Sequence, residues 1–141
     1  MMSAKERTKI EFQHRRIREL HDISDIVELL FPGNRNQQHA AACILYELKW
    51  SQRIVPNLVF MQDRYNISRR TLQRTRAKLS RLGLIEHVSG LGVRDAGQRG
   101  WRLSGRFSAA LRTLAEKVDE WRRDTRPERK ERERLLISVV R

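Results

Sequence analysis

The chain has 141 residues, of which 39% are hydrophobic, and its 30 lysines and arginines outnumber 17 acids for a net charge of +13. This length fits one domain with extensions, and the charge indicates nucleic acid before an anionic membrane as the partner. No apolar run of 18 residues exists, which excludes a membrane-spanning helix, and the single cysteine, Cys43, excludes an intrachain disulfide. With no secretory signal in the polar N-terminal stretch, we expect a cytoplasmic location.

Residues 1–35 are expected to form a basic helical extension. Residues 3–20 combine a weak apolar face with basic side chains, which suits either packing on the core or contact with phosphates. Asp22 or Ser24 can cap a short apolar helix over 23–31, which a Pro-Gly pair ends.

The middle of the chain, residues 36–107, contains two helices ahead of a strongly basic one. Asn36 can cap a helix over about 37–51, whose small apolar residues allow close packing. A short β-favouring segment follows, and Asn57 can then cap a second helix over 58–65.

The stretch 64–81 holds seven Lys or Arg residues and no acid. Asn66 can take the left-handed conformation of a turn, and Ser68 is a good N-cap for the helix that follows. Apolar side chains recur at helical spacing up to Gly83, where a left-handed C-terminal cap favours glycine. We therefore predict a helix over 68–82. The face opposite its leucines carries Arg70, Gln73, Arg74, Ala77 and Arg81.

A β-hairpin is predicted directly after this helix. Residues 84–88 and 101–103 have the alternation and composition of strands. The glycine-rich segment 89–100 between them carries Arg94 and Arg99.

Four features follow one another within residues 58–85. They are an apolar Met61, a turn that ends in Ile67-Ser68, Thr71 three residues later, and a closing Leu-Gly-Leu-Ile at 82–85. In this order they resemble the winged helix-turn-helix domains of bacterial and archaeal transcriptional regulators. The resemblance covers residues 36–107 and implies a mainly α fold with a small β-hairpin. Gln62 and Arg76 depart from it, because the family usually has alanine and a large apolar residue there.

The resemblance also implies a DNA-binding surface. The N-terminal half of a recognition helix normally reaches base edges, where Arg pairs with guanine and Gln with adenine. Basic residues further along the helix suit phosphate contacts, and those on the wing suit phosphates or the minor groove. The candidate DNA-binding residues are Ser68, Arg69, Arg70, Thr71, Gln73, Arg74, Lys78, Arg81, Arg94 and Arg99.

Residues 108–141 are expected to form a C-terminal extension with a fourth helix to about Arg123. The apolar stripe of this helix consists of Leu111, Leu114, Val118 and Trp121. Such a stripe suits packing on the winged domain or pairing with a second subunit, and the resemblance favours a homodimer. Residues 126–134 are nearly all charged, as in a solvated helix or a disordered segment, whereas 135–140 are apolar enough to need burial.

These patterns together predict a sequence-specific double-stranded DNA-binding protein, most simply a dimeric transcriptional regulator. A plasmid or phage protein of replication or maintenance would use the same domain. The alternatives are an RNA-binding winged domain, which an aromatic content of 6% disfavours, and a protein-interaction module. No metal-ligand spacing, phosphate-binding loop or nucleophile motif is present in the sequence, so we expect no enzyme activity and no cofactor.

Overall fold

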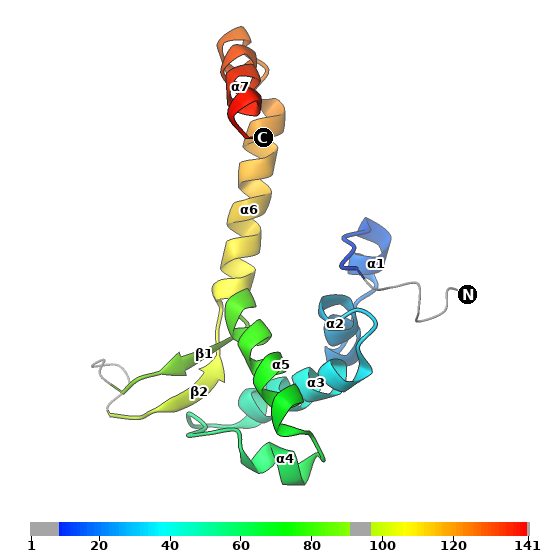
Figure 1. The fold of residues 1–141 in the computed structure, drawn as a ribbon, viewed down its shortest axis with the longest axis vertical. Coiled ribbons are helices and arrows are strands. Elements are labelled where there is room, and N and C mark those ends of the chain that lie inside the picture. Colours follow the sequence, from blue (N-terminus) through cyan, green and yellow to red (C-terminus); the bar gives the residue numbers. More distant parts are fainter. Residues whose placement is uncertain (1–8, 91–96, 141) are drawn as a thin grey trace. The chain divides into compact units, whose positions relative to one another are not determined.

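The computed structural model describes residues 9–90 and 97–140. The chain forms two compact units, one up to Gly105 and the other from Arg106 onward. Helices and a two-stranded antiparallel sheet make up the first unit, and helices alone make up the described part of the second (Figure 1). The expected mainly α fold with a small β-hairpin is therefore confirmed. None of the helices in these ranges is both long and apolar enough to cross a membrane.

The N-terminal region contains two short helices, α1 (His14–Arg18) and α2 (Ile23–Leu30). In the described part of the expected helix over 3–20, only the five residues of α1 are helical, and no side chain caps them. A helix this short gains little without a cap or a buried face. Asp22 does cap α2, because its carboxylate accepts from the amides of Ser24 and Asp25.

The longest helix of the first unit is α3 (Arg35–Trp50). Its N-cap is Asn34, whose Oδ1 accepts from the amide of Gln37 at 3.0 Å, so the prediction of Asn36 was wrong. Gly33, with φ of +74°, turns the chain immediately after α2. The helix therefore begins earlier than the cap preference alone indicated.

A short helix, α4 (Phe60–Arg64), precedes the turn into the basic helix. Asn57 was predicted to cap a helix that begins at residue 58. Its side chain instead accepts from the amide of Val59 at 3.1 Å, which closes a turn ahead of α4. Asn stabilises both arrangements through the same type of hydrogen bond, so the residue alone does not distinguish them.

The basic helix is α5 (Arg69–Leu82), and its two ends lie where the sequence placed them. The Ser68 hydroxyl accepts from the amide of Thr71 at 3.1 Å, as expected of an N-cap. Gly83 closes the helix in the left-handed conformation, with φ of 87°. Asn66 is also left-handed, with φ of 52°, which confirms the predicted turn between α4 and α5.

The hairpin consists of β1 (Ile85–Val88) and β2 (Gly100–Leu103), which pair antiparallel with Val88 opposite Gly100. Val55, in the β-favouring segment before α4, extends this sheet by one bridge to Trp101. The two residues exchange backbone hydrogen bonds of 3.0 and 2.8 Å. The base of the hairpin is thereby attached to the segment between α3 and α4.

The core of the first unit lies between α3 and the elements around it. α2 and α5 pack on α3, β1 packs on α5, and β2 packs on α3 (Figure 1). The largest fully buried side chains are Phe31, Ile44, Leu58, Met61, Thr75, Leu79 and Ile85. Since Thr75 and Leu79 belong to α5, this packing fixes which face of α5 is turned outward.

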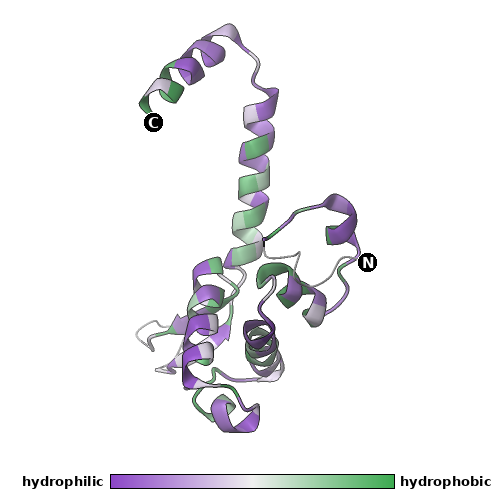
Figure 2. Cartoon of the chain, turned by 45° about the vertical axis from the view of Figure 1, so that its right-hand side comes forward, coloured by the Kyte–Doolittle hydropathy of each residue, from purple (hydrophilic) through white to green (hydrophobic). Residues whose placement is uncertain are grey.

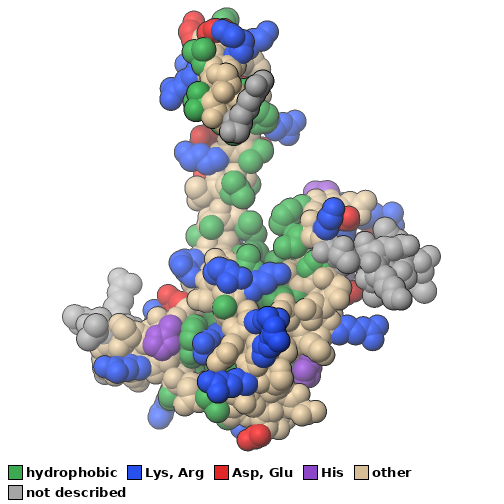
Figure 3. All heavy atoms as spheres, viewed as in Figure 1, with side chains coloured by type: hydrophobic (Ala, Val, Ile, Leu, Met, Phe, Trp, Pro, Cys, Tyr) green, Lys and Arg blue, Asp and Glu red, His purple; other side chains and the backbone are tan. Residues whose placement is uncertain are grey.

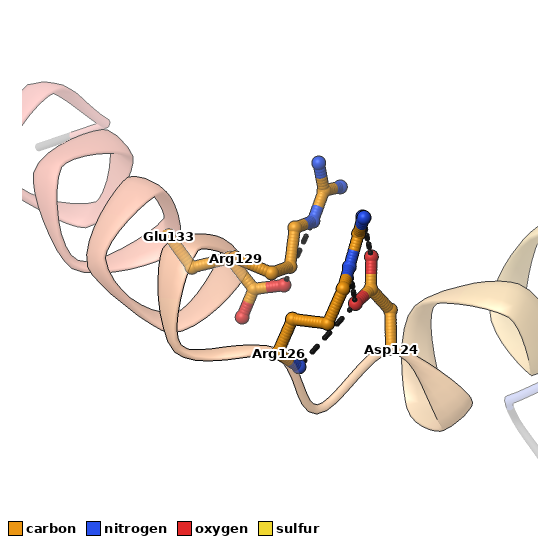
Figure 4. A network of polar contacts seen from close by, with 4 residues as sticks. All are labelled: Asp124, Arg126, Arg129 and Glu133. Carbon is orange, nitrogen blue, oxygen red and sulfur yellow. Dashed lines mark hydrogen bonds and ion pairs between the residues drawn. The ribbon is translucent and has the colours of Figure 1, made fainter.

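The second unit contains α6 (Arg106–Arg123) and α7 (Pro127–Val139). Pro127 is the first residue of α7, a position that proline favours, and the charged run that follows it is helical. Between the helices, Asp124 accepts two hydrogen bonds of 2.8 Å from the Arg126 guanidinium. Within α7, Arg129 Nε lies 3.4 Å from Glu133 Oε1 (Figure 4). The hydrogen bonds from Arg126 lower the pKa of Asp124 to about 2, so this turn keeps its ion pair at neutral pH.

Candidate nucleic-acid interface

The outward face of α5 is basic and free of acids. Its exposed side chains include Arg69, Arg70, Gln73, Arg74 and Arg81. Figure 3 shows lysine and arginine side chains gathered on the surface over α5. Within the described ranges, none of the four arginines forms an ion pair with an acid, so their charges are available to a ligand.

Two features of α5 determine which way its basic face points and where its electrostatic potential is most positive. Leu72, Thr75 and Leu79 are buried, and the polar residues are therefore directed to solvent. The Ser68 cap fixes the N-terminal end, where the helix dipole adds positive potential to that of the first-turn arginines. An anionic ligand is favoured most strongly at this end.

Ser68 and Thr71, both predicted to bind DNA, are engaged with each other. The Ser68 hydroxyl donates to Thr71 Oγ1 at 2.9 Å while it accepts from the Thr71 amide. Their placement serves the start of the helix, and Ser68 remains exposed at the end of the basic face.

Lys78 lies on a flank of α5 away from the exposed arginines. Its ammonium group donates to the carbonyl of Leu30 and lies 4.3 Å from the centre of the Phe31 ring. Burial lowers the pKa of Lys78. Lys78, which was predicted to contact a phosphate, therefore joins α5 to the end of α2.

Arg76, which departed from the family pattern, lies on the opposite flank, toward the hairpin. Its guanidinium is 5.1 Å from the centre of the Trp101 ring, a cation–π distance. His87 meets the same ring edge-on, with 4.9 Å between centroids. The sequence alone does not connect these three residues. The signal was an arginine at an expected apolar position, followed 25 residues later by a tryptophan in the second strand.

One of the two arginines predicted on the wing lies in the described part of the hairpin. Arg99 is exposed immediately before β2, whereas Arg94 lies outside the described residues. Arg102, three residues further along in β2, contacts Glu86 at 3.1 Å. Of the described arginines in the hairpin, Arg99 is therefore the better candidate for a phosphate contact.

A polar cluster joins the end of α4 to α3. Glu47 accepts hydrogen bonds from the Tyr65 hydroxyl and, at 2.9 Å, from the Arg64 guanidinium. The hydrogen bond to Glu47 raises the pKa of Tyr65 to about 12, and the Tyr65 contact is the largest cause of a lowered pKa at Glu47. This cluster ties the last residues of α4 to α3 immediately before the turn.

Within the described residues, no group of His, Cys, Asp and Glu is arranged to hold a metal ion. Comparisons with protein-family models, with curated proteins and with solved structures found no match to this chain. The geometry and charge of α5 and the hairpin are therefore what indicates a function.

Proposed function

We propose that this chain is a sequence-specific double-stranded DNA-binding protein with a winged helix-turn-helix domain, and that α5 is its recognition helix. The observation that carries the proposal is the outward face of α5. It presents four exposed arginines and a glutamine, with no acid in the helix. The helix, turn, helix and hairpin in succession are compatible with this architecture.

The dimensions and donors of α5 suit the major groove. An α-helix with side chains is about 10–12 Å across, and the major groove of B-DNA is about 12 Å wide. Arg70 and Arg74 can donate in pairs to guanine O6 and N7, and Gln73 can pair with adenine N6 and N7. Arg69 stands at the same end of the helix, and Arg81 at the far end suits a phosphate. Phosphate contacts orient the domain, and base contacts choose the sequence.

The hairpin adds a second contact beside the helix. Arg99 is exposed at its described end, and Trp101 joins β2 to α5 through Arg76. A hairpin fixed in this way can follow the DNA backbone or enter the minor groove when α5 occupies the major groove. Lys78 is not part of this proposed surface, because its ammonium group is already bonded to Leu30.

The most direct biological role is transcriptional regulation by a homodimer. Two copies would place two α5 helices on half-sites about 10 base pairs apart, so the preferred DNA would be close to palindromic.

The decisive comparison is between arginines on and off the α5 face. Arg70→Ala and Arg74→Ala should each weaken binding to a preferred duplex about 5- to 150-fold, since a bidentate base contact contributes about 1–3 kcal/mol. Arg112→Ala, at an exposed position of α6, removes the same charge and should change the affinity less than about twofold.

Fluorescence anisotropy at one fixed salt concentration would measure these affinities, and circular dichroism would confirm that each variant is folded. Unchanged affinity in folded Arg70→Ala and Arg74→Ala proteins would show that α5 does not read DNA. A duplex RNA of the same sequence, used as competitor, separates DNA from RNA. Equal competition by the RNA would contradict the proposal.

A further inference from the structure

The second unit exposes nearly all of its large apolar side chains. Neither α6 nor α7 has a buried residue. Leu114 is 58% exposed, Trp121 57% and Val140 80%. Such exposure is costly for side chains of this size and marks a surface that a partner covers.

The apolar residues of α6 follow a heptad spacing. Phe107, Leu111, Leu114, Val118 and Trp121 succeed one another at intervals of four, three, four and three residues. This spacing places all five on one stripe, and it is the spacing of helices that pack on one another with interlocking side chains. The alternation of hydrophobic and hydrophilic residues along α6 is visible in Figure 2.

α7 contributes a second apolar surface beside this stripe. A groove between the two helices is lined by Trp121, Glu133, Leu136, Ile137 and Val140. Its cavity of about 530 Å³ is open to solvent. The end of α6 and one side of α7 thus border an apolar groove that is incompletely filled.

We propose that a second copy of this chain occupies this surface, with the two α6 helices antiparallel and each α7 covering the partner's stripe. Two copies associated in this way bring four helices together, and the spacing on α6 suits such packing.

The apolar area that the second unit exposes is comparable with what a stable dimer buries, and α7 spreads its share over more than one side of the helix. The nine large apolar side chains involved are Leu111, Leu114, Val118, Trp121, Leu135, Leu136, Ile137, Val139 and Val140, which are 38–80% exposed. At roughly 170 Å² for a fully exposed side chain of this kind, they present on the order of 900 Å² per chain. A standard stable interface buries about 800 Å² per partner.

The charges beside the stripe select the antiparallel orientation. Lys117 and Arg122 flank the stripe at the positions that face each other in a parallel pair of helices, which would place two like-charge pairs across the interface. The exposed contact of Lys117 with Glu120, at 3.8 Å, offsets this repulsion only in part. In an antiparallel pair centred near residues 112–113, Lys117 instead faces Ala110 of the partner subunit.

The use of such a dimer, to place two recognition helices on one DNA site, rests on the proposed function. The pairing itself does not, and it is measured without DNA. Light scattering of the full chain after size exclusion, at tens of micromolar, should give twice the chain mass of 16.8 kDa. A DNA-binding defect with an intact dimer would therefore count against the proposed function alone.

A matched pair of variants tests the stripe. Leu114→Glu places a charge at its centre and should yield a folded monomer, because an unpaired buried carboxylate strongly disfavours association. Thr113→Glu adds the same charge on the solvent side of the same turn and should remain dimeric. A monomeric wild-type chain, or a dimeric Leu114→Glu chain, would overturn the proposal.

Spin-label distances test the orientation without disrupting the interface. Labels would be attached at Thr113→Cys or at Arg123→Cys in a Cys43→Ala background. For helices antiparallel about residues 112–113, the two Arg123 sites are about 30 Å further apart along the axis than the two Thr113 sites, at 1.5 Å per residue. Equal distances at both positions would mean parallel helices and would contradict the proposal.

Discussion

Replacing Gly100 by alanine should detach the base of the hairpin from Val55. Gly100 begins β2 with φ of +139°, a conformation that L-residues rarely adopt. A Cβ at this position would lie 2.2 Å from the Val55 carbonyl oxygen and 2.7 Å from its carbon. Both neighbours are backbone atoms, so the clash is relieved only if the strand moves.

The cost of this change has two parts. Backbone strain at such an angle is about 1–3 kcal/mol. Movement of β2 would also break the two hydrogen bonds between Val55 and Trp101, each with a net contribution of about 0.5–1.5 kcal/mol. Gly100→Ala should therefore lower the free energy of unfolding by about 2–6 kcal/mol, and Tm should fall by roughly 4 °C for each kcal/mol.

Two other glycines provide graded controls in a chemical or thermal denaturation series. Gly97 has φ of +79°, but no atom of the described residues lies within 4 Å of a Cβ there, so Gly97→Ala should cost only the strain, about 1 kcal/mol. Gly105 has neither constraint, and Gly105→Ala should be nearly neutral. If Gly100→Ala were no more destabilising than Gly97→Ala, the close approach of Val55 to the hairpin would be refuted.

Three further predictions concern the core, the polar cluster and the basic face. The buried Thr75 hydroxyl has no hydrogen-bond partner among the described residues, so Thr75→Val should raise the free energy of unfolding by about 1 kcal/mol. If urea denaturation showed a loss of stability instead, the Thr75 hydroxyl would have to form a hydrogen bond in the folded chain. The lowered pKa of Glu47 means that its ion pair and hydrogen bonds stabilise the fold above the ordinary value of 4.5 and lose effect as pH falls below it. The stability advantage of wild type over Glu47→Gln should therefore be present at pH 6 and shrink in acid; a constant difference would count against it. Arg81→Ala should reduce the slope of log affinity against log salt by about 0.9, whereas Lys78→Ala should leave it unchanged, because that ammonium group bonds to Leu30. Equal slopes for the two variants would contradict the different placements of these residues.

Local signals in the sequence predicted α5 and its two ends correctly. Ser68, Gly83 and Asn66 each have a strong preference for one backbone role, and each has that role in the structure. The hairpin was predictable for the same reason, since the change from helical to alternating periodicity is a local property. The outward basic face then followed from the position of the leucine stripe.

Tertiary contacts account for what the sequence did not reveal. Asn34 and Asn36 are equally good caps, and the turn at Gly33 decides between them. Lys78 and Arg76 have the same basic character as the exposed arginines of α5. Lys78 is hydrogen-bonded to the end of α2, and the Arg76 guanidinium lies over the Trp101 ring. The sequence alone does not indicate either contact.

Selection of bound duplexes from a random DNA pool is the most direct test of the central claim, that the outward face of α5 reads DNA sequence. We expect the wild-type chain to enrich a near-palindromic site with half-sites about 10 base pairs apart. A folded protein with Arg70→Ala and Arg74→Ala should enrich no such site, although it still binds DNA weakly through its remaining charge. Failure of the wild-type chain to enrich any sequence, or enrichment of the same site by the double variant, would contradict the account.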